Sequence, residues 1–191
     1  MPLEFFPIPT SRLILRRFVE TDWHTFLTYR NDPEIARYQG WSNISAETAQ
    51  NFVREMNLAE FGVAGRWFQI ALALPATDEL IGDIGVHFQA DDIHQAEIGY
   101  TVCRAYQGRG LATEAVTATI DLLFQKTPVT NLTAITDTRN EPSIKLLVKL
   151  GFQLVQTDTA YFHDVACEEH TFQLSQQQWM QSTDSALKGR A

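Results

Sequence analysis

The sequence has little cysteine and no long run of apolar residues. Its two cysteines, Cys103 and Cys167, are too few for a disulfide framework or a structural zinc site, which fits a reducing compartment. The longest apolar run, Ile70–Pro75, is far shorter than the ~20 residues that cross a bilayer. The first residues lack the basic stretch and the small-residue cleavage site of a secretory signal. We therefore expect a cytoplasmic protein without a membrane segment.

Basic residues are also in the minority. The chain has 15 Lys and Arg against 23 Asp and Glu, which gives a formal net charge of -8. This balance argues against binding of long nucleic acids through their phosphates and favours a cationic partner. A local basic pocket can still hold a small anion on such a protein. The 5 histidines show no His-x-x-x-His or similar spacing, so the sequence predicts no metal site.

The length of the chain corresponds to one ordinary domain. With 191 residues, 45% of them apolar, the chain has enough material for one hydrophobic core. We assign residues 1–181 to this domain and residues 182–191 to a loose polar C-terminal tail. The sequence leaves open whether the protein is a monomer or a homodimer.

Hydrophobic periodicity predicts an α+β fold. Apolar residues alternate as in strands over residues 12–18, 67–74, 81–88, 96–102, 132–136, 152–157 and 169–174. Helical spacing is found after Thr21, Ser45 and Gly110, and over residues 142–150. The three central strands are expected to form an antiparallel meander, and the strand, helix and strand over residues 96–136 a right-handed crossover. We expect a mixed, mostly antiparallel twisted sheet flanked by helices on both faces.

Breaker residues mark the ends of these helices. Asn31–Pro33 is expected to end the first helix, and Pro128 the one that begins after Gly110. Gly151 suits the left-handed position just past the last helix, where Phe152 can fold back on Leu147 as in a Schellman ending.

The most informative segment runs from Glu97 to Ala115. In it a strand ends, Gly108 and Gly110 permit a tight turn, and a helix begins at once. The amide N–H groups of such a turn converge at the positive end of a helix, where they can bind an anion such as a diphosphate. Arg109 can add a charge-assisted contact. Taken alone, Gly-x-Gly is equally consistent with a turn that binds nothing.

Two common nucleotide-binding loops do not fit this segment. A dinucleotide fingerprint needs Gly or Ala three residues after its second glycine and lies in the first βα turn of its domain. Here Thr113 holds that position, and a long stretch of chain precedes the motif. No Gly-Lys-Ser/Thr follows the turn, so a Walker loop is excluded.

Residues Gln107–Ala112 resemble the Gln/Arg-x-x-Gly-x-Gly/Ala signature of the GCN5-related N-acetyltransferase (GNAT) superfamily, in which it cradles the pyrophosphate of acetyl-CoA. Three longer segments, Thr10–Arg16, Tyr106–Ala115 and Asn140–Phe152, are similar to the Rim-type branch that acetylates the N-termini of ribosomal proteins. They occur in the expected order, and the resemblance covers about residues 10 to 175.

The resemblance implies a set of residues that bind acetyl-CoA. Backbone groups near Thr101 and Val102 should contact the pantetheine arm, because in the family this strand splays from the next one. The residues that should hold the diphosphate are Gln107, Gly108, Arg109, Gly110, Leu111, Ala112 and Thr113. Asn140 matches an asparagine that contacts the cofactor arm, although a helix-cap role before Pro142 explains it nearly as well.

The catalytic residues are expected on two elements. Ser143 matches a serine proposed to hydrogen-bond the leaving CoA thiolate, and the alternative is an ordinary serine of the first helical turn. Glu97 is the candidate that takes the proton of the amine, directly or through water, and the alternative is a solvated carboxylate at a strand end. An α-amino group needs little base catalysis, since roughly 10–15% of it is neutral at pH 7. Deprotonation of a lysine amine costs about 3.5 kcal/mol more. Glu114 is expected to be a polar partner rather than a catalyst.

We therefore expect an acetyl-CoA-dependent N-acetyltransferase that transfers the acetyl group directly to a primary amine. A protein N-terminal α-amino group is the preferred acceptor, and a small amine such as a polyamine, an amino acid or an aminoglycoside is the alternative. A third possibility, of another class, is a non-catalytic acyl-CoA-binding regulatory module that kept the turn and lost the base.

Overall fold

One mixed sheet forms the centre of the structure. The computed structural model describes residues 5–39, 41, 43–162 and 165–188. The strands lie in the order β1-β2-β3-β4-β5-β6-β8-β7. Their bounds are β1 Ile8–Pro9, β2 Ile14–Arg16, β3 Trp67–Ala73, β4 Leu80–Phe88, β5 Gln95–Val102, β6 Asn131–Asp137, β7 Gln153–Phe162 and β8 Val165–Ser175.

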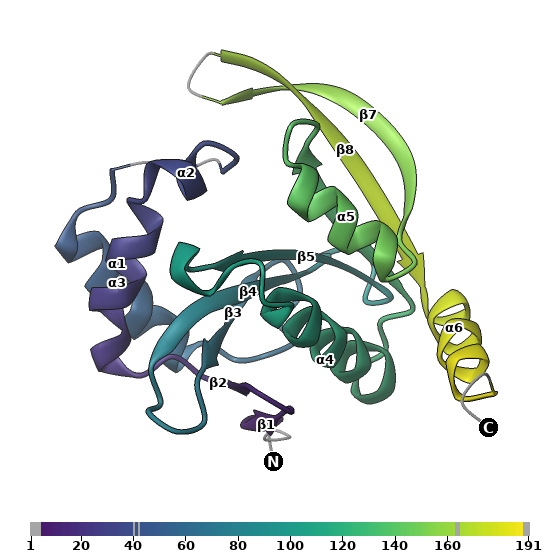
Figure 1. Ribbon diagram of the computed structural model, residues 1–191, viewed down its shortest axis with the longest axis horizontal. Coiled ribbons are helices and arrows are strands. Elements are labelled where there is room, and N and C mark those ends of the chain that lie inside the picture. Colours follow the sequence, from purple (N-terminus) through teal and green to yellow (C-terminus); the bar gives the residue numbers. More distant parts are fainter. Residues whose placement is uncertain (1–4, 40, 42, 163–164, 189–191) are drawn as a thin grey trace.

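Helices cover both faces of this sheet, as the sequence predicted (Figure 1). The helix α4 and the helix α5 share a hydrophobic cluster with one face, whereas α1, α2 and α3 share another cluster with the opposite face. The bounds are α1 Trp23–Arg30, α2 Pro33–Ala36, α3 Ala46–Leu58, α4 Leu111–Lys126, α5 Glu141–Lys149 and α6 Gln176–Lys188, with short 3-10 helices at Glu20–Asp22 and Arg104–Tyr106. No helix in the described part of the chain is long and apolar enough to cross a membrane.

The predicted meander is confirmed. The strands β3, β4 and β5 pair in antiparallel order, with Ile70 opposite Ile84 and Ile84 opposite Tyr100. The strand β5, the helix α4 and the strand β6 form the predicted crossover unit, and β5 and β6 are parallel. Their pairing covers only the first residues of β5 and ends where Glu97 lies opposite Thr133. Beyond this point the two strands separate within the sheet.

The predicted helix ends are confirmed at two places. The Ser45 hydroxyl accepts the backbone N–H of Thr48 and caps α3. At the end of α5, Gly151 has a φ of +89°, and the N–H of Phe152 donates to the carbonyl of Leu147 at 3.0 Å. This is the Schellman arrangement that the glycine predicted.

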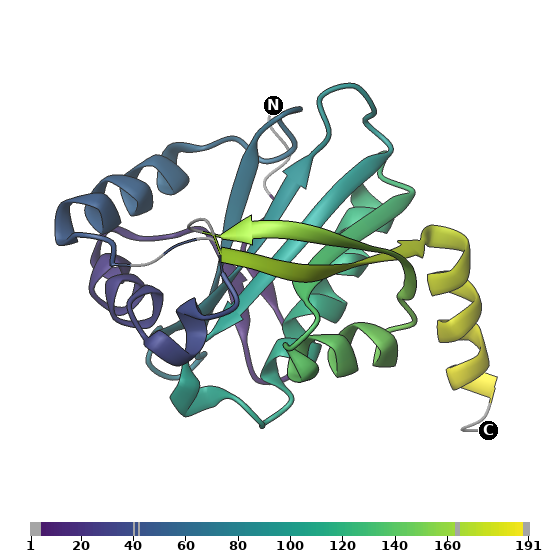
Figure 2. The ribbon, with the colours of Figure 1, turned by 90° about the horizontal axis from the view of Figure 1, so that it is seen from above.

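Three predictions about the elements differ from the structure. The Asp32-Pro33 pair does end α1, but it also begins the short helix α2, because the Asp32 carboxylate accepts the N–H of Glu34 at 3.0 Å. Strands β7 and β8 are longer than predicted, and Figure 2 shows their hairpin crossing above the central strands. Residues 182–188, expected in a loose tail, continue the helix α6, and residues 189–191 lie outside the described residues.

Candidate active site

The turn before α4 has a backbone conformation that favours glycine at two positions. Gly108 and Gly110 have φ values of +71° and +75°, a left-handed region that disfavours residues with a β-carbon. A β-carbon on Gly108 would have no atom within 4 Å, so the turn faces open space. Gly110 stands at the N-cap of α4 without a side-chain cap. The first amides of the helix are therefore available to a ligand.

Arg12 and Glu114 fix this turn against the edge of the sheet. The guanidinium of Arg12 donates to the carbonyl of Arg109 at 2.8 Å and to the carboxylate of Glu114 at 2.7 Å. Glu114 also accepts the Thr10 hydroxyl and the Arg12 backbone N–H, both at 2.6 Å. Burial would raise the pKa of Glu114, but these hydrogen bonds outweigh it and lower the pKa below its ordinary value. Glu114 is thus a polar partner within the fold, as expected.

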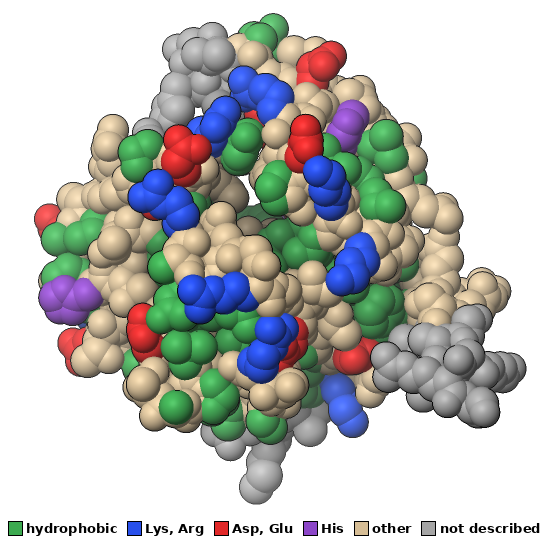
Figure 3. Space-filling model, viewed as in Figure 1, with side chains coloured by type: hydrophobic (Ala, Val, Ile, Leu, Met, Phe, Trp, Pro, Cys, Tyr) green, Lys and Arg blue, Asp and Glu red, His purple; other side chains and the backbone are tan. Residues whose placement is uncertain are grey.

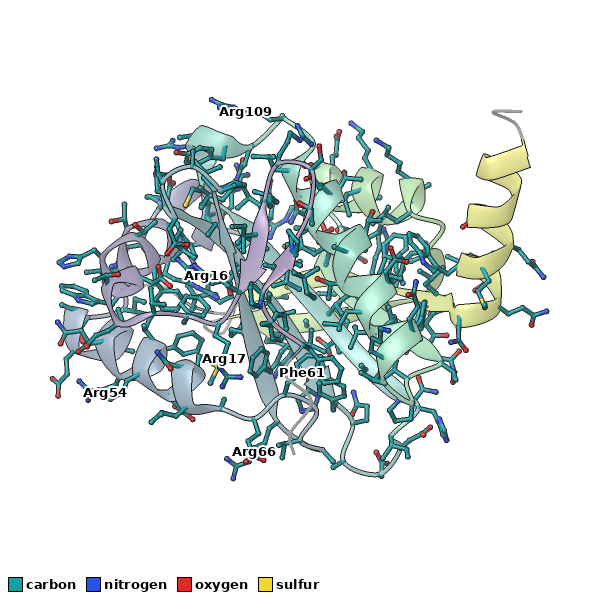
Figure 4. The ribbon with its side chains drawn as sticks, turned by 90° about the horizontal axis from the view of Figure 1, so that it is seen from below. Arg16, Arg17, Arg54, Phe61, Arg66 and Arg109 are labelled. Atoms are coloured by element: carbon teal, nitrogen blue, oxygen red, sulfur yellow. The ribbon has the colours of Figure 1, made fainter. Side chains whose placement is uncertain are left out.

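The side chains of the turn have different surroundings. Gln107 donates from Nε2 to the carbonyl of Val102 at 2.8 Å, which ties the turn to the end of β5. Arg109 is exposed, lies over the Tyr106 ring and points away from the molecule in Figure 4. Leu111 is buried in the core with only 6% of its surface exposed, so its backbone alone can serve a ligand.

A cavity of about 480 Å³ lies where β5 and β6 separate. Figure 3 shows the surface hollowed here, with Lys and Arg side chains around the opening. Its wall comes from both faces of the sheet: Glu34, Ile35, Tyr38 and Gln39 of the α2 region, residues 98–102 of β5, Tyr106, Gln107, Gly108, Gly110, Ala112 and Thr113 of the turn and α4, residues 134–136 of β6, and Asn140, Pro142, Ser143, Lys145, Leu146, Leu147 and Lys149 of α5.

The structure brings most of the predicted site residues together around this cavity. Thr101 and Val102 form the end of β5 within the wall, and Asn140 and Ser143 reach it from α5. Asn140 caps α5, since its side-chain oxygen accepts the N–H of Ser143 at 3.4 Å. Three predicted residues do not line the cavity: Arg109, Leu111 and Glu97. A residue next to each of them in the sequence does line it.

Ser143 has a partner that the sequence analysis missed. Its hydroxyl lies 2.9 Å from the hydroxyl of Tyr100, which reaches it from β5. Burial raises the pKa of Tyr100 to about 12, and the hydrogen bond with Ser143 opposes this shift. Strand alternation could have placed Tyr100 on the same face as Ile98, but no sequence signal links it to Ser143.

Glu97 lies at the point where the two strands part. It is opposite His87 on β4 and opposite Thr133 on β6, in the last pair of the parallel ladder. Burial raises the pKa of Glu97, His87 opposes this shift, and the charge of Glu169 adds to it. Glu97 directly precedes Ile98 and Gly99, which do line the cavity.

Known proteins are similar to this chain in sequence and in fold. The profile of the Acetyltransferase (GNAT) domain matches residues 12–153. An uncharacterized N-acetyltransferase, p20 of Bacillus licheniformis, is 34% identical over 146 residues, which cover 75% of this chain and 80% of that protein.

Two solved structures share the fold at low sequence identity. One is the spermidine N-acetyltransferase of Vibrio cholerae in complex with CoA and spermine, with a TM-score of 0.77 and 15% identity over 90% of this chain and 99% of that one. The other is RimL, a ribosomal L7/L12 α-N-protein acetyltransferase in complex with CoA, with a TM-score of 0.77 and 16% identity over 89% and 98%. The profile match and the similarity to p20 show that this chain belongs to the GNAT acetyltransferase family and is an N-acetyltransferase.

Proposed function

We propose that the protein transfers the acetyl group of acetyl-CoA directly to a primary amine, with the α-amino group of a protein N-terminus as the preferred acceptor. The observation that carries this proposal is the cavity between β5 and β6. Its wall includes the glycine turn and Ser143 on the side of α4 and α5, and residues of the α2 region on the opposite side of the sheet. Donor and acceptor can therefore meet within the split of the sheet. We place this reaction in the cytoplasm.

The residues of the turn fit the donor. The amides of residues 108–113 would hold its diphosphate, beside the Arg12 guanidinium that is paired with Glu114. Backbone groups of Thr101 and Val102 would hydrogen-bond the pantetheine arm, which would extend toward Ser143. Acetyl-CoA supplies the thioester carbonyl and a thiolate leaving group. Ser143, in the first turn of α5, would donate its hydroxyl hydrogen to the departing sulfur, assisted by the positive end of that helix.

Acidic groups favour a cationic acceptor on the other side. Glu34 lines the cavity there, and the charge of Glu169 is close enough to Glu97 to raise the pKa of that carboxyl. Glu97 would take the proton of the attacking nitrogen, directly or through water. One of the two solved structures is a spermidine N-acetyltransferase, and the other is a ribosomal-protein acetyltransferase. A small amine is therefore the second candidate acceptor.

Thiol release from acetyl-CoA, measured with a panel of small amines and short peptides, tests the reaction and ranks the acceptors. We expect release with peptides that have a free N-terminus and little release when that terminus is blocked. Preference for free polyamines would replace the first acceptor with the second. Cofactor binding without thiol release from any acceptor would instead favour a non-catalytic acyl-CoA-binding module.

Ser143→Ala is expected to lower kcat roughly 10- to 100-fold, because the variant loses one hydrogen bond to a charged group. The Michaelis constant for acetyl-CoA should stay within about twofold, because the serine acts on charge that develops only in the transition state. Steady-state kinetics with saturating acceptor measure both constants. A large loss of cofactor affinity with normal kcat would contradict the role in thiolate departure.

Glu97→Gln is expected to lower kcat about tenfold at neutral pH with an α-amino acceptor, since about a tenth of that amine is neutral without a base. The loss should shrink at alkaline pH. Because the pKa of Glu97 is raised, its carboxyl keeps its proton to a higher pH than an ordinary glutamate. The acid limb of the wild-type pH profile should therefore lie above the usual glutamate range, whereas the variant should follow only the titration of the amine itself. An unchanged profile would remove Glu97 from the mechanism.

A further inference from the structure

Tyr100 and Ser143 meet across the cavity from two different elements. Tyr100 lies on β5, and Ser143 lies in the first turn of α5, 43 residues later. Their hydroxyl oxygens are 2.9 Å apart, and both residues line the cavity. Among the described residues, the Ser143 hydroxyl has no other hydrogen-bond partner. The orientation of the serine hydroxyl is therefore decided by the tyrosine.

We propose that Tyr100 is a positioning residue, whose hydroxyl donates to Ser143 Oγ and so directs the serine hydrogen toward the departing sulfur of acetyl-CoA. This inference rests on the proposed function and adds to it a residue that neither the sequence motif nor the family match assigns.

The direction of the hydrogen bond follows from counting hydrogens. Each hydroxyl has one hydrogen and can accept in addition. A thiolate accepts only, and a hydrogen bond to an anion is stronger than one between neutral groups. The Ser143 hydrogen therefore goes to the sulfur, and Ser143 Oγ is left to accept from Tyr100. The Tyr100 hydroxyl is also 3.3 Å from the Ser143 carbonyl, a longer and weaker alternative that holds the ring in the same place.

Tyr100 does not give up its proton in this arrangement. With its pKa raised to about 12, well above that of an ordinary thiol (about 8.5 for cysteine), transfer of the tyrosine proton to the sulfur is strongly disfavoured. The overall reaction needs no proton from Tyr100. The amine nitrogen bonds to the acetyl carbon, the carbon–sulfur bond breaks, and its electron pair stays on the sulfur. The proton of the amine leaves through Glu97 or water.

Tyr100→Phe keeps the ring and removes only the hydroxyl. We expect kcat to fall about 3- to 10-fold, the loss of one neutral hydrogen bond, with the Michaelis constant for acetyl-CoA within about twofold. In a Ser143→Ala background the same substitution should have no further effect on kcat, because the tyrosine acts through the serine. Equal losses in both backgrounds, or wild-type kcat in the single variant, would overturn the proposal. Tyr161→Phe, on an exposed tyrosine of β7, is the matched control and should keep wild-type kinetics.

A second measurement needs no acceptor. Free CoA is titrated on the protein, and the ultraviolet absorbance of its thiolate gives the pKa of the bound thiol. Wild-type protein should lower this pKa relative to free CoA, and both Tyr100→Phe and Ser143→Ala should raise it again. A shift lost in Ser143→Ala but intact in Tyr100→Phe would refute the role of Tyr100 while leaving the serine in place. A wild-type protein that binds CoA without shifting the thiol would refute the assignment of Ser143 itself, and with it this inference.

Discussion

Gly110→Asp is expected to abolish measurable binding of acetyl-CoA. The residue has a φ of +75° and stands at the uncapped N-terminus of α4, so a carboxylate here would occupy the amides that we propose for the diphosphate. Two like charges about 4 Å apart repel by about 4 kcal/mol at the effective dielectric constant of a protein surface. That energy corresponds to a loss of affinity of about 10³-fold. Isothermal titration with CoA measures it directly.

Gly110→Asn separates charge from shape in this test. Asparagine has the size of aspartate and tolerates the left-handed region better than most residues, but it has no charge. A β-carbon at this position would approach the Arg12 guanidinium no closer than 3.5 Å, which is ordinary contact. We expect the asparagine variant to retain more affinity than the aspartate variant by at least about tenfold. Equal affinities in the two variants, or wild-type affinity in Gly110→Asp, would move the diphosphate site elsewhere.

Asp83→Asn is expected to destabilise the fold by about 3–5 kcal/mol, the cost of leaving a buried charge without its partner. Asp83 is 2% exposed and accepts the Tyr29 hydroxyl at 2.7 Å and the Arg30 guanidinium at 2.8 Å. Arg30 is itself buried and stacks on Trp41. Asparagine keeps the size of the side chain but leaves the guanidinium uncompensated, so α1 loses its main polar attachment to β4.

Thermal and urea unfolding measure this loss. For a chain of this size each kcal/mol lowers the melting temperature by about 2–4 °C. The same substitution at an exposed position, Asp91→Asn in the turn between β4 and β5, serves as the control and should leave stability unchanged within error. If Asp83→Asn unfolded at the wild-type temperature, the buried ion pair of Asp83 and Arg30 would make no net contribution to the free energy of unfolding.

Local patterns in the sequence were sufficient for most of the fold. The meander was predictable because alternation fixes which face of each strand is buried, and a shift of one residue would expose that face. The turn before α4 was predictable because Gly108 and Gly110 adopt a backbone conformation that few other residues tolerate. The end of α5 followed from Gly151 for the same reason.

The remaining features depend on contacts between distant parts of the chain. The partnership of Tyr100 with Ser143 arises because α5 folds back beside the split between β5 and β6, and no local pattern encodes that meeting. The helix α2 was missed because the Asp32-Pro33 pair was interpreted only as the end of a helix, although aspartate followed by proline is equally a helix start. The length of the β7–β8 hairpin was missed because β7 is exposed over residues 153–159 and lacks a regular apolar alternation.

The attachment of Arg12 to the glycine turn has a consequence for how the protein responds to its donor. Arg12 bridges the chain just before β2 to a turn almost a hundred residues later, through Arg109 and Glu114. A ligand that holds the turn therefore also holds the outer edge of the sheet. By mass action, a donor at a concentration 100 times its dissociation constant adds about 2.7 kcal/mol to the stability of everything its binding requires to be folded. With the turn as the proposed donor site, the equilibrium opening of residues 8–16 is therefore expected to become rarer as the concentration of acetyl-CoA rises.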